Sequence, residues 1–115
     1  MGDLAERDLS SALAHGLGRC AAVCKQTLAG YGGSSEVSVA LMRTTAALEA
    51  ALRLHTRDAE VRGVALRIAC DFARETTTLL RASGLDDRLL RCADACERVA
   101  YICEDVLADE DEQAA

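Results

Sequence analysis

Apolar side chains recur in alternating steps of three and four residues through four stretches of the chain. This spacing places them on one face of an α-helix and leaves polar residues on the other faces. The period is most regular near the C-terminus, where one unbroken series contains Leu85, Leu89, Cys92, Cys96, Val99, Cys103 and Val106. The pattern therefore predicts four amphipathic helices, each with one buried face.

Glycines and capping residues set the expected ends of these helices. Asp3 is followed three residues later by Glu6, the spacing of an N-terminal capping box, and Gly30 supplies a stop for the first helix. Thr56 is expected to cap the third helix, which ends at Gly84. The predicted helices cover residues 3–29, 35–55, 57–83 and 86–108.

The composition favours helix over strand. Half of the 115 residues are apolar, only three are aromatic, and there is no proline. The apolar residues are mostly Ala and Leu, which favour helices. Four helices joined by short connections fold most economically as an antiparallel up-down-up-down bundle. The sequence therefore predicts an all-α fold, with a four-helix bundle over residues 1–108 and an acidic disordered tail over residues 109–115.

The charge balance argues against a nucleic-acid partner. The chain has 13 basic and 19 acidic residues, and its arginines are scattered singly along the sequence rather than gathered in a stripe. The acidic N-terminal residues differ from a secretory signal, and no apolar run approaches the ~20 residues of a membrane span. We therefore expect a cytoplasmic protein without membrane partners. In a reducing compartment, its six cysteines point to metal binding or redox chemistry.

The cysteines fall on the apolar faces of the predicted helices. Cys20 and Cys24 lie shortly before Gly30, and Cys92 and Cys96 lie at a similar distance after Leu85. In an up-down-up-down bundle the first and last helices are antiparallel neighbours, so a rise of ~1.5 Å per residue brings the two pairs to the same height. Counted from the connection before the last helix, Cys70 lies level with residues 96–103. We therefore expect four clustered thiols, with Cys70 and Cys103 one or two turns deeper.

Thiols alone in an apolar core select soft metals: Cu(I), Zn(II) or an iron–sulfur cluster. A disulfide within one Cys-x-x-x-Cys pair is disfavoured, because Cβ atoms at i and i+4 are ~5–6 Å apart and a disulfide needs ~3.8 Å. Zinc in a closed four-thiolate site, or a bulky [4Fe–4S] cluster, would leave two cysteines unexplained. Cu(I) accepts two or three thiolates and lets sulfurs bridge. We therefore predict a Cu(I) site with the ligands Cys20, Cys24, Cys92, Cys96, Cys70 and Cys103.

Other interpretations of the cysteines stay open. Cysteine is a small, frequently buried residue, and Cys70 taken by itself fits a structural role in the core. Thiol redox chemistry is a further alternative. Met42 lies at the flank of its helix and is expected to pack there, while His15 and His55 are expected at the surface or at a helix end. No phosphate-binding glycine loop and no nucleophile with a matching base supports a hydrolase or nucleotide-binding function.

Two short segments resemble a known family. Residues 92–97, Cys-Ala-Asp-Ala-Cys-Glu, resemble the Cys-Ala-x-x-Cys-Glu repeats of the four-helix-bundle copper-binding proteins, the cytosolic copper storage family. Residues 20–24 are similar to the shorter repeat on the first helices of that family. The resemblance implies an antiparallel bundle with inward-pointing thiolates that bind Cu(I), usually as a tetramer. Ala-rich outer positions on the second predicted helix point separately to a homo-oligomer formed through helix faces. Storage members carry cysteines along nearly the full core, so this chain resembles a cysteine-depleted member of small capacity.

The sequence therefore predicts a cytosolic Cu(I)-binding protein that holds a small thiolate site for sequestration, storage or transfer of copper. We expect a binding protein rather than an enzyme. Two alternatives remain: a copper-dependent oxidative enzyme built on the same bundle, and a metal-free helical interaction module.

Overall fold

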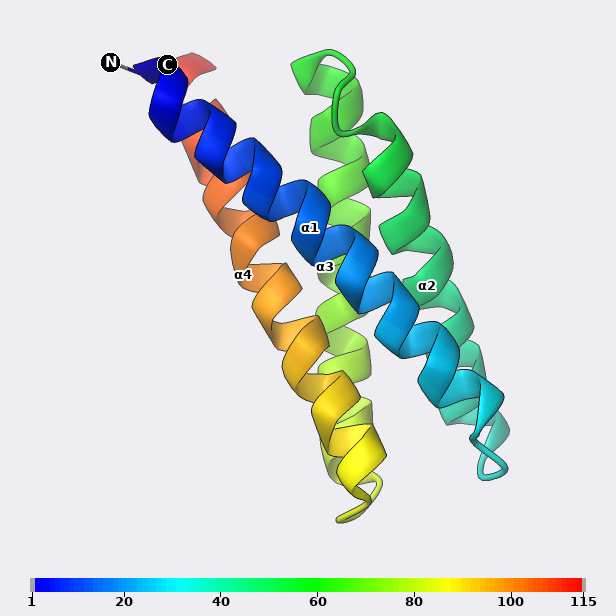
Figure 1. Cartoon of the computed structure of the whole chain (residues 1–115). Helices are drawn as coiled ribbons and strands as arrows, with labels where there is room; N and C mark the ends of the chain where they lie inside the picture. Colours follow the sequence, from blue (N-terminus) through cyan, green and yellow to red (C-terminus); the bar gives the residue numbers. More distant parts are fainter. Residues whose placement is uncertain (1, 115) are drawn as a thin grey trace.

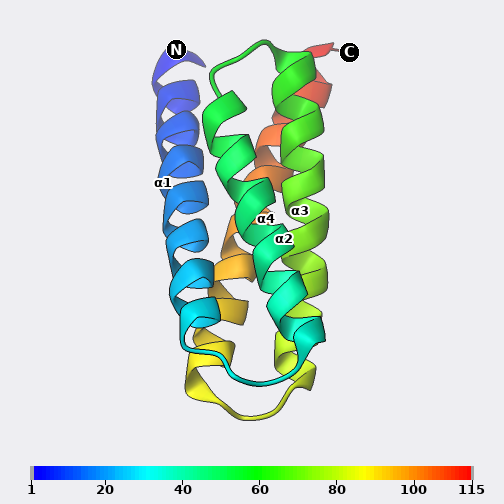
Figure 2. The ribbon, with the colours of Figure 1, turned by 90° about the vertical axis from the view of Figure 1, so that its right-hand side faces the viewer.

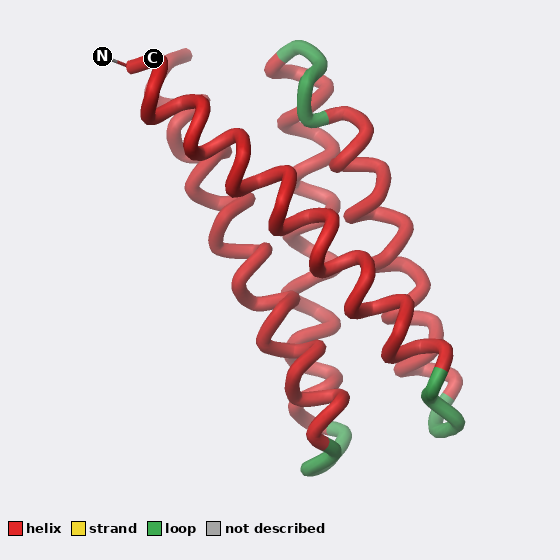
Figure 3. Tube along the Cα trace, in the orientation of Figure 1, coloured by secondary structure: helices red, strands yellow, loops and turns green. Residues whose placement is uncertain are grey.

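The computed structural model contains four long helices that lie side by side (Figure 1). They are α1 (Gly2–Ala29), α2 (Ser35–Leu54), α3 (Ala59–Ala82) and α4 (Asp87–Ala114). The structure describes the backbone of residues 2–114 and the side chains of residues 9–112. Within residues 2–114 the chain forms helices and short loops and no strand, which confirms the predicted all-α class (Figure 3).

The helices form an antiparallel bundle. Both chain termini lie at one end, and the α1–α2 and α3–α4 connections lie at the other (Figure 2). Each helix packs against two neighbours in the order α1, α2, α3, α4 and back to α1. The bundle measures 47 × 21 × 20 Å. This arrangement makes α1 and α4 neighbours, which is the condition for their cysteines to meet.

Side-chain caps fix the starts of α2 and α3. The Ser34 hydroxyl accepts a hydrogen bond from the Val37 amide at 3.3 Å, and the Asp58 carboxylate accepts one from the Val61 amide at 3.1 Å. The prediction that Thr56 caps the third helix is therefore wrong. Asp58 is the cap because its carboxylate lies directly before the first turn, where Asp is at least as good a cap as Thr.

The α3–α4 connection also departs from the prediction. The backbone turns at Gly84, whose positive φ of 120° suits glycine, and the Asp86 carboxylate then accepts a hydrogen bond from the Arg88 amide at 2.8 Å. Leu85 precedes this cap and is 91% exposed, so it is not part of the buried series of α4. The buried face of α4 begins at Leu89.

The last helix is longer than predicted. We expected it to end at residue 108 and a disordered tail to follow, but α4 continues to Ala114. The prediction is wrong for residues 109–114, and residue 115 lies outside the described part of the chain. The acidic segment is held to α3 by an ion pair between Arg62 and Glu110 and a weaker one between Arg67 and Asp111 at 4.0 Å.

Aliphatic and small side chains fill the core. Leucines from all four helices are almost fully buried, together with alanines and all six cysteines. Between α2 and α3 the core also contains threonines, and the hydroxyls of Thr44 and Thr76 are hydrogen-bonded at 2.7 Å. Only α1, α3 and α4 bring sulfur into the interior. The sulfur is concentrated on the α1–α4 side.

Candidate metal centre

Four cysteines from two antiparallel helices meet in the core. Cys20 and Cys24 lie one turn apart on α1, and Cys92 and Cys96 lie one turn apart on α4. Residues at i and i+4 share one helix face, so each helix directs both of its thiols toward the other. None of the four residues is more than 1% exposed. The predicted meeting of the two pairs at one height is confirmed.

The sulfur atoms are in direct contact. The Sγ atom of Cys96 lies 3.8 Å from that of Cys20 and 3.8 Å from that of Cys24, while the Cys24 and Cys92 Sγ atoms are 3.7 Å apart. The sulfurs of Cys20, Cys24 and Cys96 all lie within 4.8 Å of one another. These three residues, called the thiol triad below, form a group that can hold a metal ion.

The spacing suits a metal better than a disulfide. All six cysteines are free thiols, and sulfurs 3.7–3.8 Å apart are well beyond the ~2.05 Å of a disulfide bond. Two thiolates bound to one ion with metal–sulfur bonds of ~2.3 Å lie ~3.8 Å apart in a tetrahedral arrangement. The sulfurs are therefore already at the separation that ligands of a common soft metal adopt.

The cluster divides its protons unequally. Hydrogen bonding with the Cys24 and Cys96 thiols lowers the pKa of Cys20 to about 5. The same contacts work in the opposite sense on Cys96, where hydrogen bonding with Cys20, Cys24 and Cys92 raises the pKa. The pKa of Cys92 is raised to about 12, chiefly by its hydrogen bond with Cys24. The thiolate is the form that binds metals, so the lowered pKa of Cys20 favours the metal-binding form of this residue.

Cys70 and Cys103 lie outside the triad. The Cys70 Sγ atom contacts the Ala100 carbonyl at 3.8 Å and a Glu104 carboxylate oxygen at 3.7 Å. This places Cys70 at the predicted height on α4. Burial, with smaller contributions from the charges of Cys70 and Glu104, raises the pKa of Cys103 to about 12. The structure thus groups the triad with Cys92 and shows no sulfur contact for Cys70 or Cys103 among the side chains it describes.

Two residues beside the thiols were not predicted. The Thr27 hydroxyl, which donates to the Val23 carbonyl at 2.7 Å, is close enough to Cys92 to oppose the rise of its pKa. Thr27 lies three residues after Cys24 on the same helix face, so its position beside the thiols could have been predicted from the sequence. Glu104 contacts Cys70 across the α3–α4 interface, and only the packing of the two helices reveals this pair.

Three other candidate ligands lie away from the cluster. Met42 is 57% exposed, so the packing that we expected for it at the flank of its apolar face is not seen. His15 is exposed on α1, in agreement with the prediction. His55 ends α2, where its Nδ1 atom lies 2.6 Å from the Leu52 carbonyl oxygen.

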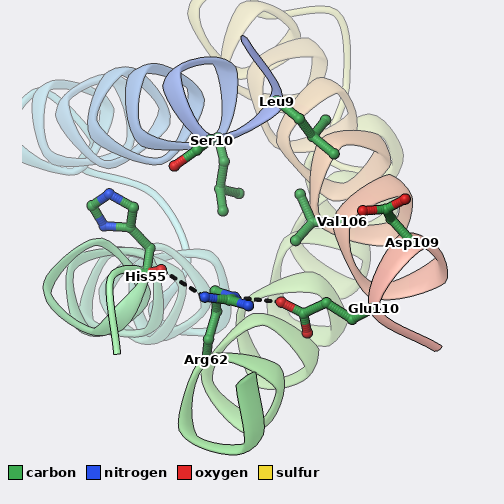
Figure 4. A pocket seen from close by; sticks show the side chains of 8 residues that line it. Leu9, Ser10, His55, Arg62, Val106, Asp109 and Glu110 are labelled. Carbon is green, nitrogen blue, oxygen red and sulfur yellow. Dashed lines mark hydrogen bonds and ion pairs between the residues drawn. The ribbon is translucent and has the colours of Figure 1, made fainter. Parts of the chain in front are cut away.

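His55 borders a pocket at the end of the bundle that carries the termini (Figure 4). The pocket has a volume of about 240 Å³ and contains no cysteine in its lining. Arg62 crosses it, donating to the His55 carbonyl at 3.4 Å and pairing with Glu110. This arginine links α2, α3 and α4, which is a structural role. The pocket is therefore not part of the thiol site.

No helix in the described part of the chain is both long enough and apolar enough to cross a membrane. The buried thiol triad is the group of described side chains best suited to bind a metal. Comparisons of the chain with protein-family models, with curated proteins and with solved structures find no match.

Proposed function

We propose that this protein binds Cu(I) in the cytosol through the thiol triad, with Cys92 as an additional ligand, and sequesters, stores or transfers it. The observation that carries the proposal is the contact of Cys96 with both Cys20 and Cys24 at 3.8 Å inside an apolar core. Such a site offers only soft ligands, which favour Cu(I) over harder ions. The resemblance of residues 92–97 to the copper storage repeats supports the same choice.

The arrangement of the sulfurs favours copper over zinc. A structural zinc site needs four ligands at the corners of one tetrahedron, each ~3.8 Å from the other three. The compact group contains three sulfurs, and Cys92 joins it by a contact with Cys24 at 3.7 Å. Cu(I) is satisfied by two or three thiolates, and a sulfur shared between ions accommodates Cys92. An iron–sulfur cluster fits less well, because the sulfurs already touch and leave no space for its inorganic core.

The number of clustered thiols favours a small capacity. Among the side chains that the structure describes, Cys70 and Cys103 contact no other sulfur, and the buried face of α2 offers threonine, leucine and alanine in place of cysteine. A site of this size suits the handling of one or a few copper ions. Homo-oligomer formation through the outer helix faces is a further part of the proposal that the resemblance suggests.

Anaerobic titration of the reduced protein with Cu(I), against a chromophoric Cu(I) chelator, tests the proposal. We expect at least one tightly held equivalent. Cys96→Ala should weaken the affinity by about 100-fold, or about 3 kcal/mol, because it removes the sulfur that contacts both of the others. Cys70→Ala is the matched control, since it removes a buried cysteine outside the triad and should leave the first equivalent unchanged.

Less than one tight equivalent would refute copper binding and favour the metal-free interaction module. Equal affinity of the wild type and Cys96→Ala would place copper elsewhere. Oxidase activity toward a small thiol or amine that disappears in Cys96→Ala would instead support the copper-dependent enzyme.

A further inference from the structure

Four arginines line the groove between α1 and α4. Arg19 comes from α1, and Arg88, Arg91 and Arg98 come from α4. All four are exposed. Arg19 is far in the sequence from the other three, which all lie on α4, and the packing of α1 against α4 gathers all four along one groove of about 460 Å³. This set is called the arginine groove below.

The arginine groove differs from the other arginine-bearing interface of the bundle. Among the described side chains, no carboxylate lies within ion-pairing distance of Arg19, Arg91 or Arg98, and Arg88 has only a 3.9 Å contact with Asp86. The four arginines of α3 are instead each paired with an acidic side chain of α4; these pairs are Arg62–Glu110, Arg67–Asp111, Arg74–Glu104 and Arg81–Glu97. The chain thus neutralises arginines at the α3–α4 interface and leaves them unneutralised between α1 and α4.

The groove is a positive region on an acidic protein. Its one acidic lining residue, Asp94, lies 3.3 Å from Arg81 of α3 and is shared with that arginine. The chain as a whole has a net charge of −6. Guanidinium groups of like charge on neighbouring turns repel one another, so they do not stabilise the bundle. An anionic ligand would relieve this repulsion, and arginine binds carboxylates in a paired geometry.

The arginine groove leads to the thiol triad. An adjoining hollow of about 250 Å³ shares Arg19, Ala95 and Arg98 with the groove, and its lining includes Cys20. Gly16 borders the same hollow, and a Cβ atom there would lie only 3.0 Å from the Ile102 side chain. The small residues Gly16 and Ala95 leave this part of the interface open. A ligand held by the arginines would therefore stand beside the Cys20 end of the triad.

We propose that the arginine groove binds the carboxylates of a small anionic thiol that carries Cu(I) and presents this Cu(I) to Cys20. This inference rests on the proposed function. The arginine groove, at about 460 Å³, has the volume of a small-molecule site. In the transfer, the bond between copper and the donor sulfur breaks as a bond to the Cys20 sulfur forms. Copper stays in the +1 state, and the departing donor thiolate takes the proton lost by the next cysteine thiol that binds.

A first experiment tests ligand binding without metal. S-methylglutathione has the carboxylates of a common anionic thiol but no free thiol, and it is titrated into the apo protein while amide NMR shifts are followed. We expect shifts centred on Arg19, Ala95 and Arg98. Arg19→Gln/Arg98→Gln should weaken binding at least tenfold, while Arg19→Lys/Arg98→Lys, which keeps the charge, should retain most of it.

The matched control is Arg43→Gln/Arg53→Gln, which removes the same charge from exposed positions on α2 and should bind like the wild type. Absence of localised shifts in the wild type, or equal binding by the Arg19→Gln/Arg98→Gln variant, would overturn the proposal. Binding that the Arg43→Gln/Arg53→Gln control loses to the same extent would overturn it too, because the effect would then follow net charge alone.

A second experiment measures copper transfer by stopped flow. Cu(I) is supplied either as its glutathione complex or as its complex with cysteamine, a thiol without carboxylates. Arg19→Gln/Arg98→Gln should slow transfer from glutathione at least tenfold at low salt and change transfer from cysteamine less than twofold. Equal slowing for both donors would contradict the proposal. Failure of the wild type to take copper from either donor would refute the proposed function, whereas the NMR titration still decides whether the groove binds the anion.

Discussion

Cysteines in this core experience two different environments. In the triad, hydrogen bonding between Cys20 and the neighbouring thiols lowers the pKa of Cys20 to about 5. Cys103 has no sulfur contact among the described residues, and burial raises its pKa to about 12. The first environment prepares a sulfur to bind metal, and the second keeps a sulfur protonated as a small apolar side chain. The sequence shows that both residues lie on buried faces, but only the packing shows which thiols touch.

The Cys103 thiol should make the free energy of unfolding of the apo protein depend on pH in the alkaline range. Its pKa in the folded state is raised from the ordinary 9.0 to about 12, so the folded state holds this proton more tightly. Its contribution to stability is complete below pH 9 and is lost as pH rises from 9 to 12. Between pH 8 and 10.5, urea unfolding should show that the wild type loses about 2 kcal/mol more than Cys103→Ala.

Val99→Ala serves as the control for that comparison, because it also truncates a buried residue of α4 but removes no titratable group. It should lower stability at every pH and keep the wild-type slope. If Cys103→Ala keeps the wild-type slope as well, the burial of the Cys103 thiol does not produce the pH dependence.

The interfaces between neighbouring helices differ in chemistry. Thiols meet between α1 and α4, ion pairs bridge α3 and α4, and threonine hydroxyls join α2 and α3. Periodicity places such residues on buried or boundary positions, and it predicted the helices themselves within a few residues. The errors fall at helix ends. Asp58, not Thr56, caps α3. The acidic end of α4 is helical and pairs with Arg62 and Arg67. These partners are distant in sequence, so the pattern of α4 alone did not reveal them.

The Thr44–Thr76 hydrogen bond should couple α2 to α3. Both hydroxyls are buried and 2.7 Å apart, so Thr44→Val leaves the Thr76 hydroxyl without one partner and should cost about 1 kcal/mol. The double variant Thr44→Val/Thr76→Val should cost less than the sum of the single changes, as a double-mutant cycle of urea unfolding would measure. Thr45→Val, whose hydroxyl bonds only within α2, should be additive with Thr76→Val. Additivity of Thr44→Val and Thr76→Val would argue against the coupling.

The Arg62–Glu110 ion pair should stabilise the end of α4. Both side chains are partly buried, so Glu110→Gln should lower the free energy of unfolding by about 0.5–1 kcal/mol, and the loss should shrink in 1 M salt. Asp111→Asn is the control, because its pair with Arg67 is long and exposed and should contribute little. Thermal unfolding at two salt concentrations measures both. A Glu110→Gln protein as stable as the wild type would show that the last turns of α4 need no ion pair.

Over the whole molecule, the clustered thiols and the exposed arginines of the arginine groove both lie on the α1–α4 side. The thiol triad lies inside this interface, and the arginine groove lies on its outer surface. The bundle and the meeting of four cysteines were predictable, because apolar period, connection length and helical rise fix the heights of residues on neighbouring helices. The arginine groove was not predictable from the sequence. Arg19 is 69 residues from Arg88, and only the way in which α1 packs against α4 brings them together.

The metal content of the protein purified without oxygen from copper-supplemented cells tests the central claim most directly. Elemental analysis should find at least one copper per chain in the wild type and in Cys70→Ala, and should find little in Cys96→Ala, which lacks the sulfur shared by the triad. Zinc or iron in place of copper, or equal copper in the wild type and Cys96→Ala, would contradict the account.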